Sequence, residues 1–200
     1  MACDFYQAAV PDGWQILGEK LLPFSLGHFI LLKRHEIAFL EGQIPSVLDL
    51  TASVMICSRT WEQAQEFIDS EDFKNETKRL ERILKKCDDL PKRIIYFSEY
   101  LEENMRGPKV WSKENDNKDE FGSPFVQVIK VSLMSKMGFS ESEVLNRPLS
   151  LCLWDMATLS ELQGLVTVYG EKDESAKNEA EELQKRIDSG EIDLDDLMRN

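Results

Sequence analysis

Apolar residues recur at intervals of three and four along most of the chain, as they do in α-helices that pack on a core. The clearest series is Val47, Leu50, Val54 and Cys57. Capping-box patterns, in which a Ser or Thr precedes an acid or amide by three residues, mark further helix starts. We therefore expect a mainly α-helical core. Its segments are residues 25–39, 46–68, 125–137 and 148–163.

Turn-forming residues interrupt this pattern between residues 104 and 123, where Gly107-Pro108 and Gly122-Ser123-Pro124 fall. Loops of this length are uncommon in compact domains, and those that occur are often functional. Trp111 lies in the middle of this segment, where it either anchors the loop to the core or contacts a partner. The sequence thus predicts a compact helical domain over residues 1–169 with a long central loop at about 104–123.

The character of the chain changes after Gly170. Residues 171–186 contain almost no large apolar side chains, and the last residues alternate acids with aliphatics such as Leu194 and Leu197. Such a composition buries too little apolar surface to offset the entropy lost on ordering. We expect residues 170–200 to form an acidic, partly disordered tail in which Leu194 and Leu197 are candidate partner contacts.

A narrow apolar stripe formed by Phe73, Leu80 and Leu84 runs along an otherwise charged helix that begins near Ser70. Such a stripe packs either on the protein's own core or on another helix, and the pattern allows both. These three side chains are therefore candidate partner contacts as well. Trp154 shares a leucine-rich helix with Leu151, so we expect its side chain to be largely buried.

The net charge and the cysteine pattern limit the kinds of partner and the cellular compartment that we expect. Acidic residues outnumber basic ones by 37 to 24, and the net charge of −13 opposes binding to phosphate backbones. The longest apolar runs, such as residues 29–32, are far too short to span a bilayer. The four cysteines are scattered without a Cys-x-x-Cys pair, which is typical of a reducing compartment. We expect a cytoplasmic protein that binds neither nucleic acid nor membrane.

The sequence shows no constellation typical of catalysis or of a cofactor. Its two histidines, His28 and His35, lack further ligands at a spacing suited to zinc. Cys57 lies in an apolar helix, where a thiolate is disfavoured. Glycine-rich phosphate loops and nucleophile-elbow motifs are absent. We expect neither enzyme activity nor a metal or cofactor, and predict binding through amphipathic helices.

Two sets of segments carry a family resemblance. The first set is Leu22-Pro23-Phe24-Ser25-Leu26-Gly27-His28, then Leu31-Leu32, and then Leu48 to Ala64, which contains Ile56-Cys57-Ser58-Arg59-Thr60-Trp61. The second set is Lys136-Met137-Gly138-Phe139-Ser140-Glu141-Ser142-Glu143, Asn146-Arg147-Pro148-Leu149-Ser150-Leu151, Trp154-Asp155 and Glu161-Leu162-Gln163-Gly164. Over about half of the chain they resemble the tail assembly chaperone-like proteins of tailed bacteriophages. In that group a Gly-aromatic-Ser, acidic, Pro-Leu, Trp stretch closes a helical domain.

The resemblance implies a function without catalytic residues. Such chaperones bind the long helical tape-measure protein, keep it soluble, and recruit tail-tube subunits in the cytoplasm of the infected host. Two alternatives stay open. One is a structural virion component, such as a connector or minor tail protein. The other is a small helical enzyme or regulator with a cryptic site, for example one that joins His28, Cys57 and a buried carboxylate.

Overall fold

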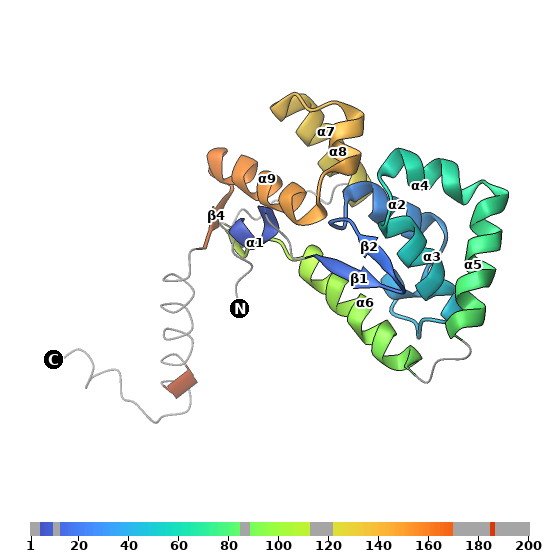
Figure 1. The fold of residues 1–200 in the computed structure, drawn as a ribbon. Coiled ribbons are helices and arrows are strands. Elements are labelled where there is room, and N and C mark those ends of the chain that lie inside the picture. Colours follow the sequence, from blue (N-terminus) through green and yellow to red (C-terminus); the bar gives the residue numbers. More distant parts are fainter. Residues whose placement is uncertain (1–4, 10–12, 85–88, 113–121, 170–184, 187–200) are drawn as a thin grey trace.

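The computed structural model describes residues 5–9, 13–84, 89–112, 122–169 and 185–186 (Figure 1). Within them the chain is mainly helical, which confirms the predicted fold class. The helices are α1 (Phe5–Ala9), α2 (Leu26–Arg34), the 3₁₀ helix η1 (Ala38–Leu40), α3 (Val47–Cys57), α4 (Trp61–Ile68), α5 (Glu71–Leu84), α6 (Leu90–Asn104), α7 (Phe125–Met137), α8 (Glu141–Asn146) and α9 (Leu149–Leu162). The strands are β1 (Trp14–Ile16), β2 (Glu19–Leu21), β3 (Val110–Ser112) and β4 (Val166–Val168).

Local capping chemistry fixes where four of these helices begin. Ser25, Ser46, Thr60 and Ser140 are the N-caps of α2, α3, α4 and α8, and each side-chain oxygen accepts the backbone N–H three residues on. In each case the side chain of that third residue accepts the N-cap backbone N–H in return, so the capping box is complete. Gly138 ends α7 in the left-handed conformation with a φ of 76°.

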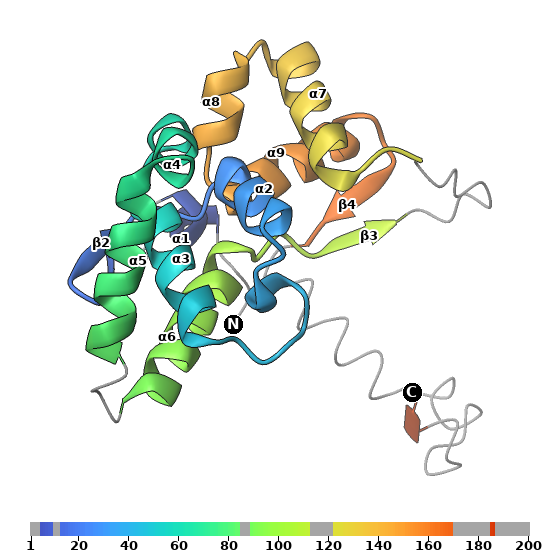
Figure 2. The same ribbon diagram turned by 90° about the vertical axis from the view of Figure 1, so that its right-hand side faces the viewer.

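Helix α3 is the centre of the larger part of the molecule. Every residue from Leu50 to Cys57 is buried, because α2, α4, α5, α6 and β2 pack around the helix. The apolar character of this segment on all sides therefore reflects burial on all sides. Helices α7 and α8 form a hairpin that stands on α2 and α9 at one end of the molecule (Figures 1 and 2).

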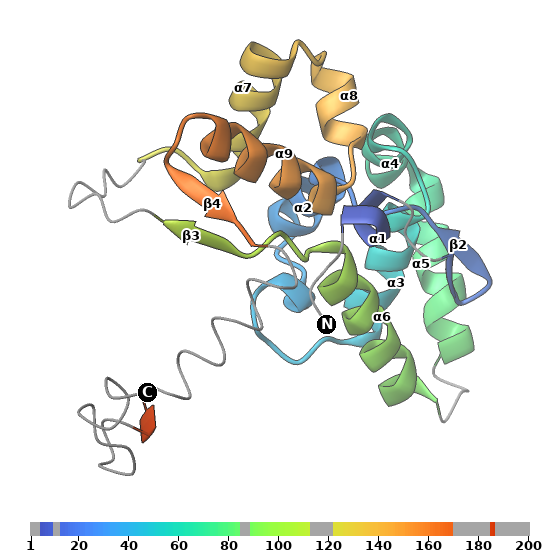
Figure 3. The ribbon, with the colours of Figure 1, turned by 90° about the vertical axis from the view of Figure 1, so that its left-hand side faces the viewer.

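Two short antiparallel strand pairs add to the helical framework, and the sequence pattern predicts neither. β1 and β2 form a hairpin around Leu17 and Gly18, whose φ values of 55° and 84° give the turn a twist that suits a two-residue hairpin. β3 pairs with β4 in a register that sets Trp111 opposite Thr167. The strand pair lies beside α9 (Figure 3). The predicted loop over residues 104–123 is thus wrong at residues 110–112, which form a strand.

The predicted tail over residues 170–200 lies outside the described residues, apart from Lys185 and Arg186. Nothing in the structure therefore bears on Leu194 or Leu197. Trp154, which we expect to be largely buried, has intermediate exposure and a buried indole nitrogen. Its side chain is half-buried in α9 and packs edge-on against Phe5 at a centroid distance of 5.7 Å.

Candidate functional site

The stripe on α5 is directed into the molecule. Leu80 and Leu84 are each only 1% exposed, because this face of α5 packs against α3. Phe73 is half-buried, and its ring meets the edge of Phe67 at a centroid distance of 5.7 Å. The choice of Leu80 and Leu84 as partner contacts is therefore wrong for this fold. Intramolecular packing accounts for the narrow stripe.

His28 has a structural role in this fold. Its Nδ1 accepts the backbone N–H of Ser25 at 3.1 Å, which leaves Nε2 to carry the proton and donate to the carbonyl of Arg59 at 2.7 Å. Burial lowers the pKa of His28 to about 4, although the hydrogen bond to Arg59 opposes that shift. The ring is therefore neutral near pH 7 and joins α2 to the end of α3. His35 is exposed at the end of α2.

The cysteines in the described residues are unsuited to nucleophilic chemistry. Burial raises the pKa of the Cys57 thiol well above its ordinary value, and raises that of Cys152 to about 12. The polar groups buried in the described part of the chain include no carboxylate, so His28 and Cys57 do not gain an acidic partner there. Across the same residues, no three His, Cys, Asp or Glu side chains are grouped to hold a metal ion.

The two sets of segments that carry the family resemblance meet in space at one place, which we call the motif junction (residues 24–28, 59–62 and 142–149). Leu26 N–H donates to the carbonyl of Arg147 at 3.1 Å, and Leu149 N–H donates to that of Phe24 at 2.8 Å. At Gly27 an added Cβ would lie 2.6 Å from Cε3 of Trp61 and 2.8 Å from the carbonyl oxygen of Leu145. Helices α2 and α8 therefore approach each other as closely as their backbones allow.

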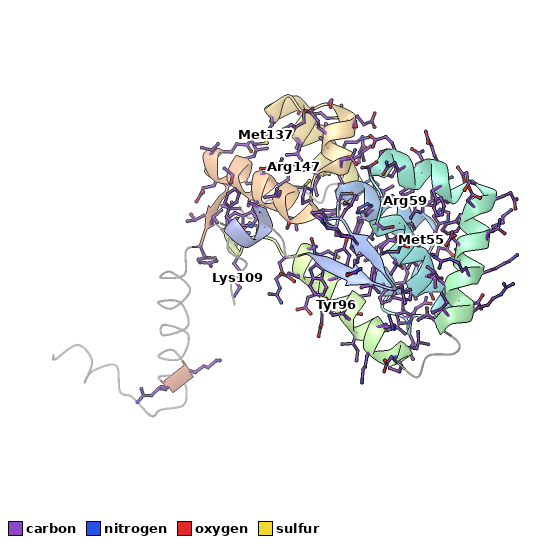
Figure 4. All side chains as sticks on the ribbon, viewed as in Figure 1. Met55, Arg59, Tyr96, Lys109, Met137 and Arg147 are labelled. Carbon is purple, nitrogen blue, oxygen red and sulfur yellow. The ribbon has the colours of Figure 1, made fainter. Side chains whose placement is uncertain are left out.

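Polar side chains close the edge of the motif junction. The Asn146 amide nitrogen donates to both carboxylate oxygens of Glu62, at 3.0 and 2.9 Å. Hydrogen bonds from Ser142 and Asn146 hold the pKa of Glu62 below its ordinary value. Arg147, labelled in Figure 4, makes two hydrogen bonds to Asp155, at 2.6 and 3.2 Å. These side chains thus link α8 to α4 and to α9, and their polar groups are paired within the chain.

An apolar groove opens elsewhere, between α2, η1 and α6, with a volume of about 430 Å³. One wall of the groove is a single face of α6. Leu101, Glu102 and Met105 lie three, four and seven positions after Ser98, so these side chains share that face. The residues lining this groove are Phe29, Lys33, Phe39, Leu40, Ser98, Leu101, Glu102 and Met105.

The polar side chains in the groove all have partners within the chain. Lys33 Nζ donates to the carbonyl of Leu40 and to Glu41, both at 3.0 Å. Ser98 Oγ donates to the carbonyl of Ile94 at 3.0 Å, and Glu102 pairs with Arg106 at 3.2 Å. The groove therefore offers an incoming molecule apolar contact in the main, with charges confined to its edge.

Aromatic rings give the groove its shape. Phe39 packs against the buried ring of Phe97 at a centroid distance of 4.7 Å, which fixes one wall. Phe125, at the start of α7, lies 6.4 Å from the ring of Phe29 and is 52% exposed. The apolar surface thus continues from the groove onto the first turn of α7. No local signal in the sequence marks this site, because its residues come from separate helices with the spacing of ordinary core positions.

A second hollow of about 550 Å³ lies by α4 and α5 and is lined mostly by polar residues. Its main cation, Arg59 (Figure 4), lies 3.8 Å above the ring of Phe67 and donates to the carbonyl of Met55 at 2.7 Å. Glu19, Glu66 and Asp72 supply carboxylates around it. This arginine is engaged by the end of α3 and by Phe67, so the apolar groove is the better candidate site.

Comparison with known proteins finds no match: no family model, curated protein or solved structure matches the chain. In the part of the chain that the structure describes, none of the helices combines the length and apolar character needed to cross a membrane. The fold and the groove together define the molecule as a mainly helical protein with one apolar, polar-rimmed groove as its candidate site.

Proposed function

We propose that this chain is a non-catalytic binding protein whose groove between α2, η1 and α6 holds an apolar helical segment of another protein. The observation that carries the proposal is the composition of the groove: Phe29, Leu40 and Met105 present apolar surface while the polar liners are already paired. A partner helix would place apolar side chains at positions i, i+3 or i+4, and i+7 into such a groove.

The partner that we propose is a phage tape-measure protein, with tail-tube subunits recruited afterwards, as in the tail assembly chaperone-like group that the chain resembles. A tape-measure protein exposes long apolar helical stripes until tube subunits cover it, and an apolar groove complements such stripes. The net charge of −13 supports this role, because mutual repulsion would keep the loaded complexes dispersed. The proposed site of action is the cytoplasm of the infected host.

Co-expression tests the proposal. The wild-type chain and fragments of the tape-measure protein from the same genome are produced together, and the amount of soluble, co-purified fragment is measured. The groove variant is Met105→Glu, which adds a charge to the groove at the C-cap of α6 without interrupting the helix. The matched control is Ile83→Glu on α5, where the isoleucine is 44% exposed and lies outside the groove.

We expect the wild-type chain and Ile83→Glu to retain and solubilise a fragment, and Met105→Glu to lose most of that capture. High salt should leave capture intact, since screening weakens charge contacts and not apolar ones. Failure of the wild-type chain to retain any fragment would overturn the chaperone proposal. Detection of the chain in purified particles would instead favour a structural virion component.

A further inference from the structure

We propose that α7 is a self-association helix, which packs antiparallel against α7 of a second copy of this chain about a two-fold axis near Val131. This inference is independent of the groove and of what the groove binds. It rests on three properties of the helix: apolar side chains left in solvent, the absence of carboxylates, and a residue pattern that is symmetric about the centre of the helix.

Among the residues that the structure describes, only one side of α7 is covered. Ile129 and Leu133 are buried against α8 and α9. On the opposite side Val131 is 50% exposed and Met134 is 37% exposed, with Val128 half-buried beside them. Figures 1 and 2 place α7 at the rim of the molecule, and Met137 at its end is 41% exposed.

Charge limits where a second copy could dock, and the outer face of α7 meets that limit. Two molecules that each carry a net charge of −13 repel one another over most of their surface. The sequence of α7 contains no Asp or Glu, and its outer face carries only Gln127 and Ser135 beside the apolar side chains. Lys130 is engaged by Glu141 at 2.9 Å. The outer face of α7 itself therefore brings no carboxylate toward a second copy, and the nearby Glu141 is paired with Lys130.

The pattern of apolar and polar residues on the outer face of α7 is the same in both directions from its middle residue. Helix α7 runs from Phe125 to Met137, so Val131 is its middle residue. In an antiparallel pair centred there, Val131 meets Val131 of the second copy, Val128 meets Met134, and Gln127 meets Ser135. Apolar residues thus meet apolar ones, and the two polar residues can exchange a hydrogen bond. A two-fold interface requires this kind of self-complementarity.

Sedimentation equilibrium on the full chain provides the first test. We expect the weight-average mass to rise with concentration from 23.1 kDa toward twice that value. A single pair of helices makes a small interface, so the dimer should be weak and reversible. Raising the salt concentration should tighten it, because screening removes repulsion between the acidic copies while apolar contact persists. Dissociation by salt would overturn the proposed face.

Two substitutions locate the interface. Val131→Glu and Ser135→Glu should each weaken association by roughly tenfold or more, since each would bring two carboxylates into the interface, where burying unpaired charge is costly. Ser135→Glu changes only an exposed polar position, so it keeps the test valid if Val131→Glu folds poorly. Ile95→Glu on α6, where the isoleucine is 58% exposed, is the control and should associate like the wild type. Equal association of all three variants would overturn the proposal.

Cysteine cross-linking tests the register. Under mild oxidation, Val131→Cys should give a disulfide between the two copies at residue 131, identified by peptide mapping so that native cysteines are distinguished. Gln127→Cys alone should not give a 127–127 disulfide, because the antiparallel arrangement separates these positions. A 127–127 disulfide would show a parallel pair, and a concentration-independent monomer mass would show that α7 does not self-associate. Either result contradicts the antiparallel dimer.

Discussion

The backbone N–H of Trp61 donates to the side-chain oxygen of Asn146 at 2.8 Å, across 85 positions of the sequence. Trp61 is the first residue of α4, where backbone N–H groups have no partner within the helix. Asn146 supplies that partner from the end of α8 and at the same time donates to Glu62. One amide side chain therefore ties together two helices that belong to different segments of the family resemblance.

Replacing Asn146 should test how much this link stabilises the fold. We expect Asn146→Ala to lower the free energy of unfolding by about 1–3 kcal/mol, because the Trp61 N–H loses its partner in a part-buried site. Urea denaturation with an unchanged m-value is the measurement. Asn75→Ala is the control, since Asn75 is exposed on α5. A loss as small as that of the control would mean that water replaces the amide without cost.

Gly27→Ala should destabilise the protein, although alanine normally stabilises a helix interior relative to glycine. The added Cβ would lie 2.6 Å from the Trp61 ring, and the backbone oxygen of Leu145 at 2.8 Å leaves little room to shift. We expect a loss of about 1–3 kcal/mol, as for other overpacked sites. The readout is the melting temperature, which should fall by about 2–4 °C per kcal/mol.

Two further variants check that steric reason. Gly13→Ala meets no atom within 4 Å, so it should leave the melting temperature nearly unchanged. Trp61→Leu should relieve part of the clash, so the two substitutions combined should cost less than the sum of their separate effects. Strict additivity of the two losses would argue against contact between the new methyl group and the ring.

Stability should depend on the protonation of His28. Its pKa is about 4 in the folded protein and near the ordinary 6.5 in the unfolded chain, so the unfolded chain binds the proton first as the pH falls. The contribution of the neutral His28 ring to the free energy of unfolding is fully present above about pH 6.5 and declines between pH 6.5 and 4. Below pH 4 it levels off, and the full loss is on the order of 3 kcal/mol. Urea denaturation at several pH values measures this slope.

The variant His28→Gln removes the titrating ring, so it should flatten the dependence of stability on pH in that window relative to the wild type. Carboxylates also titrate near its lower end, and the difference between the two proteins cancels their contribution. His35→Gln is the matched control because that side chain is exposed. Parallel curves for the wild type and His28→Gln would show that His28 is not held neutral by burial.

The two buried thiols should resist alkylation in the native protein. Burial raises the pKa of both Cys57 and Cys152, and only the thiolate reacts. At pH 8 we expect iodoacetamide to label each at least about a hundredfold more slowly in buffer than in denaturant. Differential labelling followed by peptide mass mapping follows each site separately, and rapid native labelling at either one would contradict its burial.

Local patterns in the sequence predict the helices well because the signals for a helix lie within a few residues of one another. The Ser25, Thr60 and Ser140 caps are clear in the sequence and open helices in the structure. The β3–β4 pair is missed because each strand is only three residues long and its partner lies far along the chain. The direction of Leu80 depends on how α5 meets α3, which the stripe alone does not specify.

The groove was beyond prediction for a similar reason. Phe29 and Leu40 have the spacing of ordinary core residues, and Met105 follows a helix that ends near a Gly-Pro pair. What distinguishes them is that η1 and α6 stop short of filling the space beside α2. Such incomplete packing is a property of the assembled helices. The motif segments, in contrast, are visible in the sequence and serve the interior of the fold.

The pairing of β3 with β4 has a practical consequence for engineering. The stretch between Ser112 and Val166 includes α7, α8 and α9, and the pairing of β3 with β4 holds its two ends together. Lengthening a closed loop is entropically cheap, at about 0.6 kcal/mol for each doubling of its length. A fluorescent domain or affinity tag inserted between β3 and α7 should therefore leave the rest of the fold in place, which offers a handle for purification that touches neither chain end.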